Sequence, residues 1–124
     1  MSEQDQNTSP GYSNQRLTKD QQDQLLFMML VQQHEQICMM GLGKIKNPGT
    51  DKIERDMGSA KYAIDTLEML QRYTKNNLPN EVDNFLEQTL TNLRLNYVDE
   101  SSAEKNEKRK DESSEKKDET EGKE

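Results

Sequence analysis

The clearest helical signal in this chain lies in residues 53–70, which read IERDMGSAKYAIDTLEML. Apolar side chains recur there at alternating steps of four and three residues, a spacing that places them on one face of an α-helix. They are Ile53, Met57, Ala60, Ile64, Leu67 and Leu70. The stretch therefore predicts an amphipathic helix over about residues 51–75, with Thr50 or Asp51 at its start and Asn76 or Asn77 as a left-handed cap at its end.

Two further helices are predicted on either side of this one. Thr18 followed by Gln21 is a capping-box pattern, so we expect a helix over about residues 19–41 that ends at Gly41 and Gly43. Pro79 suits the first turn of a third helix over about residues 79–98. Its apolar stripe consists of Val82, Phe85 or Leu86, Leu90, Leu93 and Tyr97. No strand pattern competes, so the expected fold class is all-α, a small three-helix domain.

The two ends of the chain lack such patterns. Residues 1–17 are rich in Gln, Asn and Ser, and residues 99–124 form a mixed-charge run whose one apolar side chain is Ala103. Segments with so little to bury are typically disordered. The expected organisation is a disordered head over 1–17, a helical domain over 18–98 and a disordered charged tail over 99–124.

Composition narrows the possible functions. The 124 residues carry a formal charge of −7, and the thin cluster of Lys44, Lys46 and Lys52 lies among acidic residues, so nucleic acid is not an expected partner. The start of the chain does not resemble a signal peptide, and the longest apolar run, residues 25–31, is far too short to span a bilayer. Because the lone Cys38 cannot form an internal disulfide, a reducing compartment fits. We expect a cytoplasmic protein with no membrane partner.

Read together, the helical segments carry an ordered set of motifs. They are Phe27-x-x-Leu30-Val31, Leu42-Gly43 with Asn47-Pro48, Asp56-Met57-x-x-Ala60-x-x-x-Ile64-Asp65-x-Leu67-x-x-Leu70, Thr74-x-x-Asn77-Leu78 and Leu90-x-x-Leu93-Arg94-x-x-Tyr97-Val98. With these motifs, residues 25–98 resemble a small bacterial helical family catalogued as a domain of unknown function, number eighteen-forty-four. The resemblance implies a short, cytosolic, all-helical bacterial protein and implies no reaction.

His34 and Cys38 form the one pair of residues that suggests a metal. Four residues apart on a helix, they share a face and would supply two ligands to zinc. A structural zinc needs four ligands, so a second copy would have to bring the other two. The simpler interpretation is an apolar seam made of Phe27, Val31, His34 and Cys38. We therefore predict no cofactor and no metal, and keep a metal-dependent regulatory role as an alternative.

The first helix also carries a second apolar seam on a neighbouring face. It consists of Leu26, Met29 or Leu30, Gln33, Ile37 and Met40. Two seams need two sets of neighbours, and the other two helices either wrap the first completely or leave one seam to a partner. We expect a non-enzymatic interaction module that self-associates as a homodimer, or binds another protein, through this helix. The predicted anchors are Phe27, Leu30, Val31, Ile37 and Met40.

Asp65 and Arg94 are the charged residues most closely embedded in apolar stripes. An unpartnered buried charge is costly, so we hypothesise that the two form a structural ion pair between the second and third helices. The alternative is a small enzyme with an acid-base site at an interface, made of Asp65, Glu68 and His34. This alternative is not favoured, because no nucleophile, phosphate-binding loop or metal motif accompanies these residues. No catalytic residue is predicted.

Overall fold

The structure, a computed structural model, describes residues 16–121, with side chains up to residue 111. Its three helices are α1 (Lys19–Gly41), α2 (Met57–Tyr73) and α3 (Asn80–Glu121). The described residues contain no strand, only one isolated antiparallel bridge between Asn47 and Lys52. The all-α, three-helix prediction is confirmed. Most of the predicted disordered head, residues 1–15, lies outside the described residues, as do residues 122–124.

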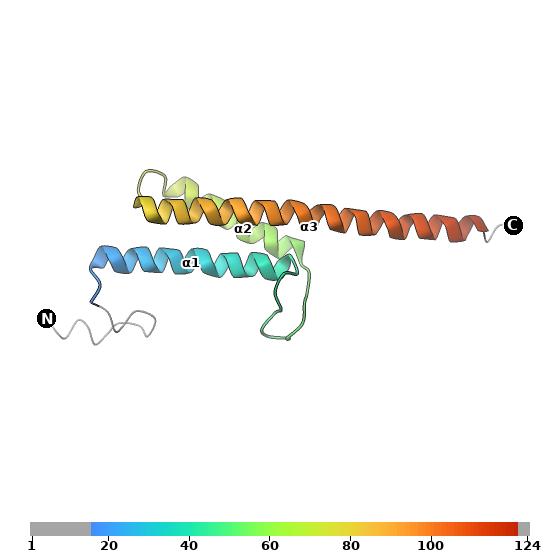
Figure 1. Ribbon diagram of the computed structural model, residues 1–124, viewed down its shortest axis with the longest axis horizontal. Helices are drawn as coiled ribbons and strands as arrows, with labels where there is room; N and C mark the ends of the chain where they lie inside the picture. Colours follow the sequence, from blue (N-terminus) through green and yellow to red (C-terminus); the bar gives the residue numbers. More distant parts are fainter. Residues whose placement is uncertain (1–15, 122–124) are drawn as a thin grey trace.

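The three helices form a small bundle in which each contacts the other two. Figure 1 shows α1 along one edge of the bundle and α3 along the other, with α2 crossing behind them. The chain runs along α1, returns along α2 and runs forward again along α3, which continues well beyond the other two helices. The loop of residues 42–56 lies at the C-terminal end of α1, and its middle part extends away from α3.

The start of α1 is held by the predicted capping box. The Thr18 hydroxyl accepts the backbone N–H of Gln21 at 3.1 Å, and the Gln21 side chain accepts the backbone N–H of Thr18 at 3.0 Å. Both bonds satisfy donors that the first turn of a helix leaves without partners. The end of the helix is set by Gly43, whose φ of +76° is left-handed, whereas Gly41 is still helical.

Gly41 has a different role, which is close packing between α1 and α2. Asp56 donates its backbone N–H to the carbonyl oxygen of Gly41 at 2.8 Å. A Cβ atom at position 41 would lie 2.6 Å from the Asp56 carbonyl oxygen and 2.8 Å from the Ala60 nitrogen. Only glycine therefore allows the two backbones to meet here.

The core lies between the three helices and is built from the predicted stripes. Leu67, Leu90 and Leu93 are fully buried, in agreement with the helical spacing of the sequence. The cluster consists of Val31, Cys38 and Leu42 near or on α1, Ala60, Ala63, Ile64 and Leu67 on α2, and Leu86, Leu90 and Leu93 on α3. Ile53, by contrast, is 55% exposed in the loop, so its assignment to the apolar stripe was wrong.

The expected start of the second helix at residue 51 was also wrong. α2 begins at Met57, with Asp56 as N-cap, because the Asp56 side chain accepts the backbone N–H of Ser59 at 3.2 Å. Asp51 has a φ of 56°, which is incompatible with an α-helix. At the other end, Asn76 adopts a φ of 64°, so the predicted left-handed asparagine cap is confirmed.

The third helix does not end near Val98 as predicted, because α3 continues to Glu121. Its 42 residues make it about 63 Å long at 1.5 Å per residue. The prediction considered burial alone, whereas charges support the extension. Arg55 of the loop forms ion pairs with Glu100 and Glu107, both at 3.1 Å, and Lys108 pairs with Glu104 one turn away at 3.3 Å.

Replacing Gly41 with alanine should destabilise the bundle. The added Cβ would overlap backbone atoms of Asp56 and Ala60, so we expect the free energy of unfolding to fall by about 1–3 kcal/mol. Gly58→Ala is the matched control, since the exposed Gly58 has room for a methyl group and alanine raises helix stability by up to about 1 kcal/mol. Chemical denaturation measures both, and equal effects would contradict the close contact.

Candidate interaction surface

One face of α1 is apolar and is only partly covered by the rest of the described chain. We call it the α1 strip, and it consists of Leu26, Met29, Leu30, Gln33, Ile37 and Met40. Leu26 is 46% exposed, and Met29 and Leu30 are each 37% exposed. Gln33 is exposed, while Ile37 and Met40 are half-buried. α2 and α3 therefore do not wrap α1 completely, and the second seam of the sequence is the open one.

The predicted anchors divide between this strip and the core. Val31 is completely buried, and Phe27 packs partly buried against the core, so these two do not belong to the free surface. Including Val31 among the anchors was wrong, because it lies one residue, or 100° of helix rotation, from the exposed Leu30. Leu30, Ile37 and Met40 lie on the strip, although Ile37 also touches the core.

The α1 strip is also unusual in having no charge. Residues 24–43 contain one charged side chain, Glu35, which is half-buried and lies two residues from Gln33, on another side of the helix. The exposed neighbours are the glutamines Gln32, Gln33 and Gln36. A helix that faces only water normally carries charges on its outer face, and depletion of charge with exposed apolar residues is typical of protein interfaces.

His34 and Cys38 share the seam that faces the core, as the sequence predicts. The His34 Nδ1 donates to the Leu30 carbonyl oxygen at 3.0 Å, and its ring centroid lies 6.4 Å from that of Tyr62. Burial, with a smaller effect of Glu35, raises the pKa of the Cys38 thiol to about 11, so the thiolate that a metal requires is disfavoured. Among the side chains that the structure describes, those of residues 16–111, no group of three or more His, Cys, Asp or Glu could hold a metal ion.

The ion pair between α2 and α3 is made by a different carboxylate from the one predicted. Arg94 pairs with Glu68 at 3.0 Å, whereas Asp65 pairs with Lys61 of its own helix at 2.7 Å. Asp65 is 55% exposed, because it lies further round α2 from α3 than Glu68 does. Since Asp65, Glu68 and His34 engage different partners, the structure does not assemble them into an acid-base site.

Asp65 does line a shallow surface depression of about 470 Å³ on α2. Its other lining residues are Gly58, Lys61, Tyr62, Thr66 and Met69. The Thr66 hydroxyl, the one Ser or Thr oxygen there, donates to the backbone carbonyl of Tyr62 at 2.8 Å. The arrangement therefore offers no nucleophile bound to a base.

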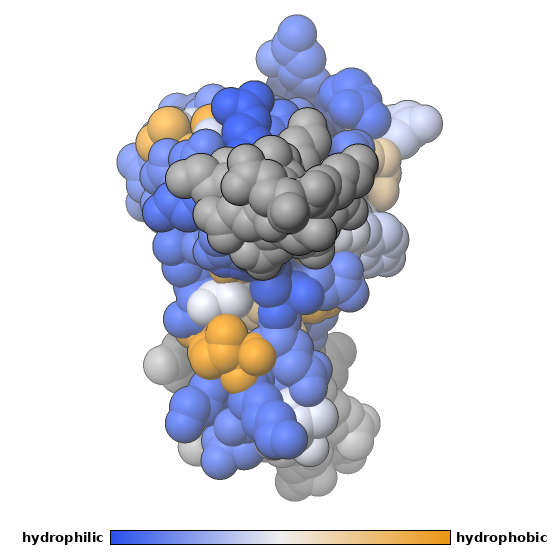
Figure 2. Space-filling view, turned by 90° about the vertical axis from the view of Figure 1, so that its right-hand side faces the viewer, coloured by the Kyte–Doolittle hydropathy of each residue, from blue (hydrophilic) through white to orange (hydrophobic). Residues whose placement is uncertain are grey.

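The loop of residues 42–56 presents both charge and apolar surface. Ile45 is 40% exposed between the exposed Lys44 and Lys46, and Ile53 is 55% exposed. Lys44 lies 3.6 Å from Glu100 of α3. Figure 2 shows this end of the molecule as mainly hydrophilic, with an apolar spot below the grey end of α3.

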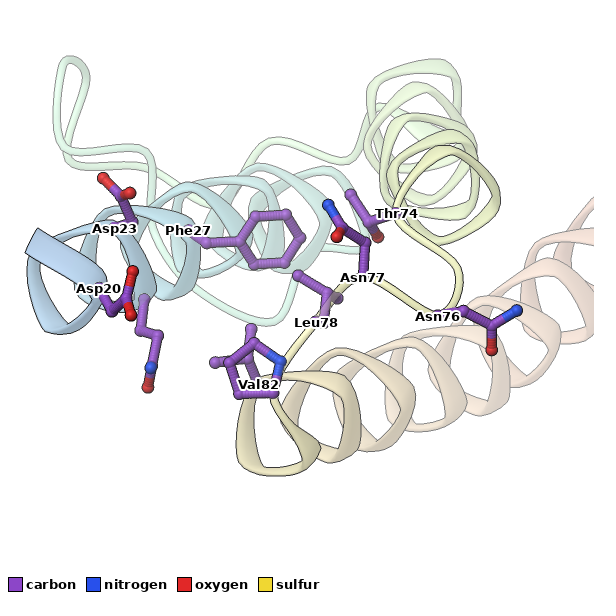
Figure 3. Close-up of a pocket in the computed structure, with 10 residues that line it drawn as sticks. Asp20, Asp23, Phe27, Thr74, Asn76, Asn77, Leu78 and Val82 are labelled. Carbon is purple, nitrogen blue, oxygen red and sulfur yellow. The ribbon is translucent and has the colours of Figure 1, made fainter.

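A hollow of about 710 Å³, which we call the end hollow, lies at the opposite end of the bundle. It forms between the first turns of α1 and the turn from α2 to α3, and Figure 3 shows Phe27, Leu78 and Val82 facing one another inside it. Asp20 and Asp23 stand on its α1 side. Sequence reasoning missed this hollow, because its two walls lie some fifty residues apart in the chain and no local pattern connects them.

The fold defines a small all-α domain of three helices with one open apolar helix face. The chain belongs to the family described as a domain of unknown function (DUF1844), whose model matches residues 24–100. The match covers α2, most of α1 and the first half of α3. No curated protein and no solved structure matches the chain. Among the helices described, none is both long enough and apolar enough to cross a membrane.

A double-mutant cycle should show that Arg94 couples to Glu68 and not to Asp65. Because the Glu68 and Arg94 side chains are 34% and 41% exposed, we expect a coupling of about 0.2–1 kcal/mol for this pair. The matched cycle of Asp65→Ala with Arg94→Ala should give additive changes in the free energy of unfolding. Coupling of Arg94 to Asp65 would restore the pairing that the sequence suggested.

The raised pKa of Cys38 makes stability depend on pH in the alkaline range. The unfolded thiol loses its proton near pH 9 and the folded thiol near pH 11, so the folded state binds more protons between these values. The contribution of Cys38 to the free energy of unfolding is therefore complete below about pH 9 and is lost as the pH rises to about 11. Chemical denaturation across this pH range should show that the free energy of unfolding falls more steeply with pH in the wild type than in Cys38→Ala. Parallel curves for the two proteins would contradict the raised pKa of Cys38.

Proposed function

We propose that this protein is a non-enzymatic helical interaction module that self-associates through the α1 strip. The observation that carries the proposal is the open face of α1, on which Leu26, Met29 and Leu30 are exposed and no charge occurs. Covering this face with a second copy would remove apolar surface from water without desolvating a charged group.

The size of the domain supports the same proposal. The core described above includes small side chains such as Ala60 and Ala63. Domains of fewer than about 80 residues bury too little apolar surface to be very stable alone. Fully burying one more leucine or methionine contributes about 1.5–3 kcal/mol, so several exposed residues on one helix can stabilise an association.

Within this proposal the protein acts in the bacterial cytoplasm and its partner is a protein. The formal charge of −7 and the pairing of Lys44 and Arg55 with glutamates support a protein partner over nucleic acid. Resemblance to a family of short cytosolic proteins supports the location. A different helical protein in place of the second copy is the other occupant that the same face would accept.

Light scattering of the full chain tests self-association. At about 100 µM, well above a micromolar Kd, we expect twice the chain mass of 14.4 kDa. Leu30→Glu should give the single-chain mass, because the new carboxylate would be buried in the interface. Leu95→Glu is the matched control, since Leu95 is 63% exposed on α3, away from the strip.

Circular dichroism on the same samples should show equal helix content for the wild type and both variants. A wild-type chain that is folded and has the single-chain mass would contradict the proposal. Loss of the double mass on adding a metal chelator would instead support the metal-dependent alternative through His34 and Cys38.

A further inference from the structure

We infer that two copies of this chain pair their α1 helices antiparallel about Gln33, and that each copy's loop residues 44–46 dock in the end hollow of the other. The inference rests on the proposed self-association and specifies its geometry. Three observations carry it: the paired apolar positions of the α1 strip, the opposite charges of Asp20 and Lys46 near its two ends, and the fit between the loop and the end hollow.

Two pairs of apolar residues in the α1 strip lie at equal distances before and after Gln33, whereas the position that mirrors Leu30 is the exposed Gln36. Leu26 lies seven residues before it and Met40 seven residues after it, while Met29 and Ile37 each lie four residues away. In a two-fold interface, residue i contacts residue j and j contacts i. Antiparallel helices centred on Gln33 would therefore place Leu26 against Met40 and Met29 against Ile37, with Leu30 beside Gln36.

The central layer would be Gln33 itself, which would meet Gln33 of the second copy on the two-fold axis. A glutamine amide both donates and accepts hydrogen bonds, so two of them satisfy each other. A single polar layer of this kind is known to fix register in helical interfaces. Slipping the two helices past one another would leave both amides against apolar groups without partners.

Charge distinguishes the antiparallel from the parallel arrangement. The first turns of α1 carry Asp20 and Asp23, of which Asp23 pairs with Lys19 at 3.1 Å. The chain just beyond the end of α1 carries Lys44, which lies 3.6 Å from Glu100, and the exposed Lys46. Asp20 and Lys46 lie thirteen residues on either side of Gln33. Parallel helices would place Asp20 near Asp20 and Lys46 near Lys46. Antiparallel helices would instead place Asp20 of one copy near Lys46 of the other, and they would set the two helix dipoles in the favourable antiparallel orientation.

The end hollow fits the loop that would reach it. Phe27, Leu78 and Val82 form its apolar part, polar side chains such as Thr74 and Asn77 line the rest, and the carboxylates of Asp20 and Asp23 stand on its α1 side. The loop is complementary to the end hollow, because the exposed Ile45 would meet its apolar residues and the exposed lysines on either side of Ile45 would meet its carboxylates. Figure 1 shows the loop and the end hollow's turn from α2 to α3 at opposite ends of α1, as an antiparallel pair requires.

Single-cysteine cross-linking of the full chain tests the arrangement. The native Cys38 remains in place, because it is buried and its raised pKa keeps it unreactive. A disulfide forms only where two Cα atoms approach within about 7 Å. Under mild oxidation we expect Gln33→Cys to give a covalent dimer, Leu26→Cys alone to give none, and Leu26→Cys with Met40→Cys to give one. The mass of every variant is measured before oxidation.

These readouts separate the arrangement from self-association itself. A dimeric chain in which Leu26→Cys links to itself would be parallel, which overturns this inference and leaves the proposed function standing. A dimeric chain that links at none of these positions overturns the use of the α1 strip. A folded chain of single mass overturns both the inference and the proposed function.

A charge swap tests the contact between the loop and the end hollow. Asp20→Lys and Lys46→Asp should each raise the Kd of the dimer about three- to tenfold, because each places like charges together at both ends of the interface. The double variant should recover most of the wild-type Kd. A double variant whose Kd rises by the product of the two single effects would overturn the predicted contact.

Discussion

The rest of the structure depends on the close contact between α1 and the start of α2 at Gly41. Asp56 donates its backbone N–H to the Gly41 carbonyl, and backbone atoms of Asp56 and Ala60 fill the space that a side chain at position 41 would need. Because the two backbones meet at this point, α2 returns along the seam of α1 that carries Val31 and Cys38. α3 then completes the core against both helices.

This arrangement explains why α1 keeps an open face. α2 and α3 both pack on the seam around Val31, and the small buried side chains Ala60 and Ala63 let α2 approach α1 closely. The α1 strip lies on another side of the helix from this seam, so these neighbours cover it only in part. The contacts that make the core tight therefore leave Leu26 and Leu30 in water, and the proposed interaction surface is a consequence of the packing.

The loop of residues 42–56 connects this bundle to the long extension of α3. Arg55 binds Glu100 and Glu107, which lie two turns apart on α3, and Lys44 lies near Glu100 as well. These pairs also raise the pKa of Arg55, first through its bond to Glu107. Exposed ion pairs are individually weak and are screened by salt. The extension thus differs from the bundle in being supported by charge instead of apolar burial.

The sequence by itself determined the three helices and most of their ends, because capping and apolar spacing act within a few residues. The Thr18 and Gln21 box and the buried Leu67 stripe are examples. The extension of α3 was not predictable from burial, since its support comes from the distant Arg55. Only the tertiary structure decided which seam of α1 is buried, and that Glu68 instead of Asp65 meets Arg94. Both depend on the rotation of each helix about its axis, which is set when the helices pack together and not by local sequence.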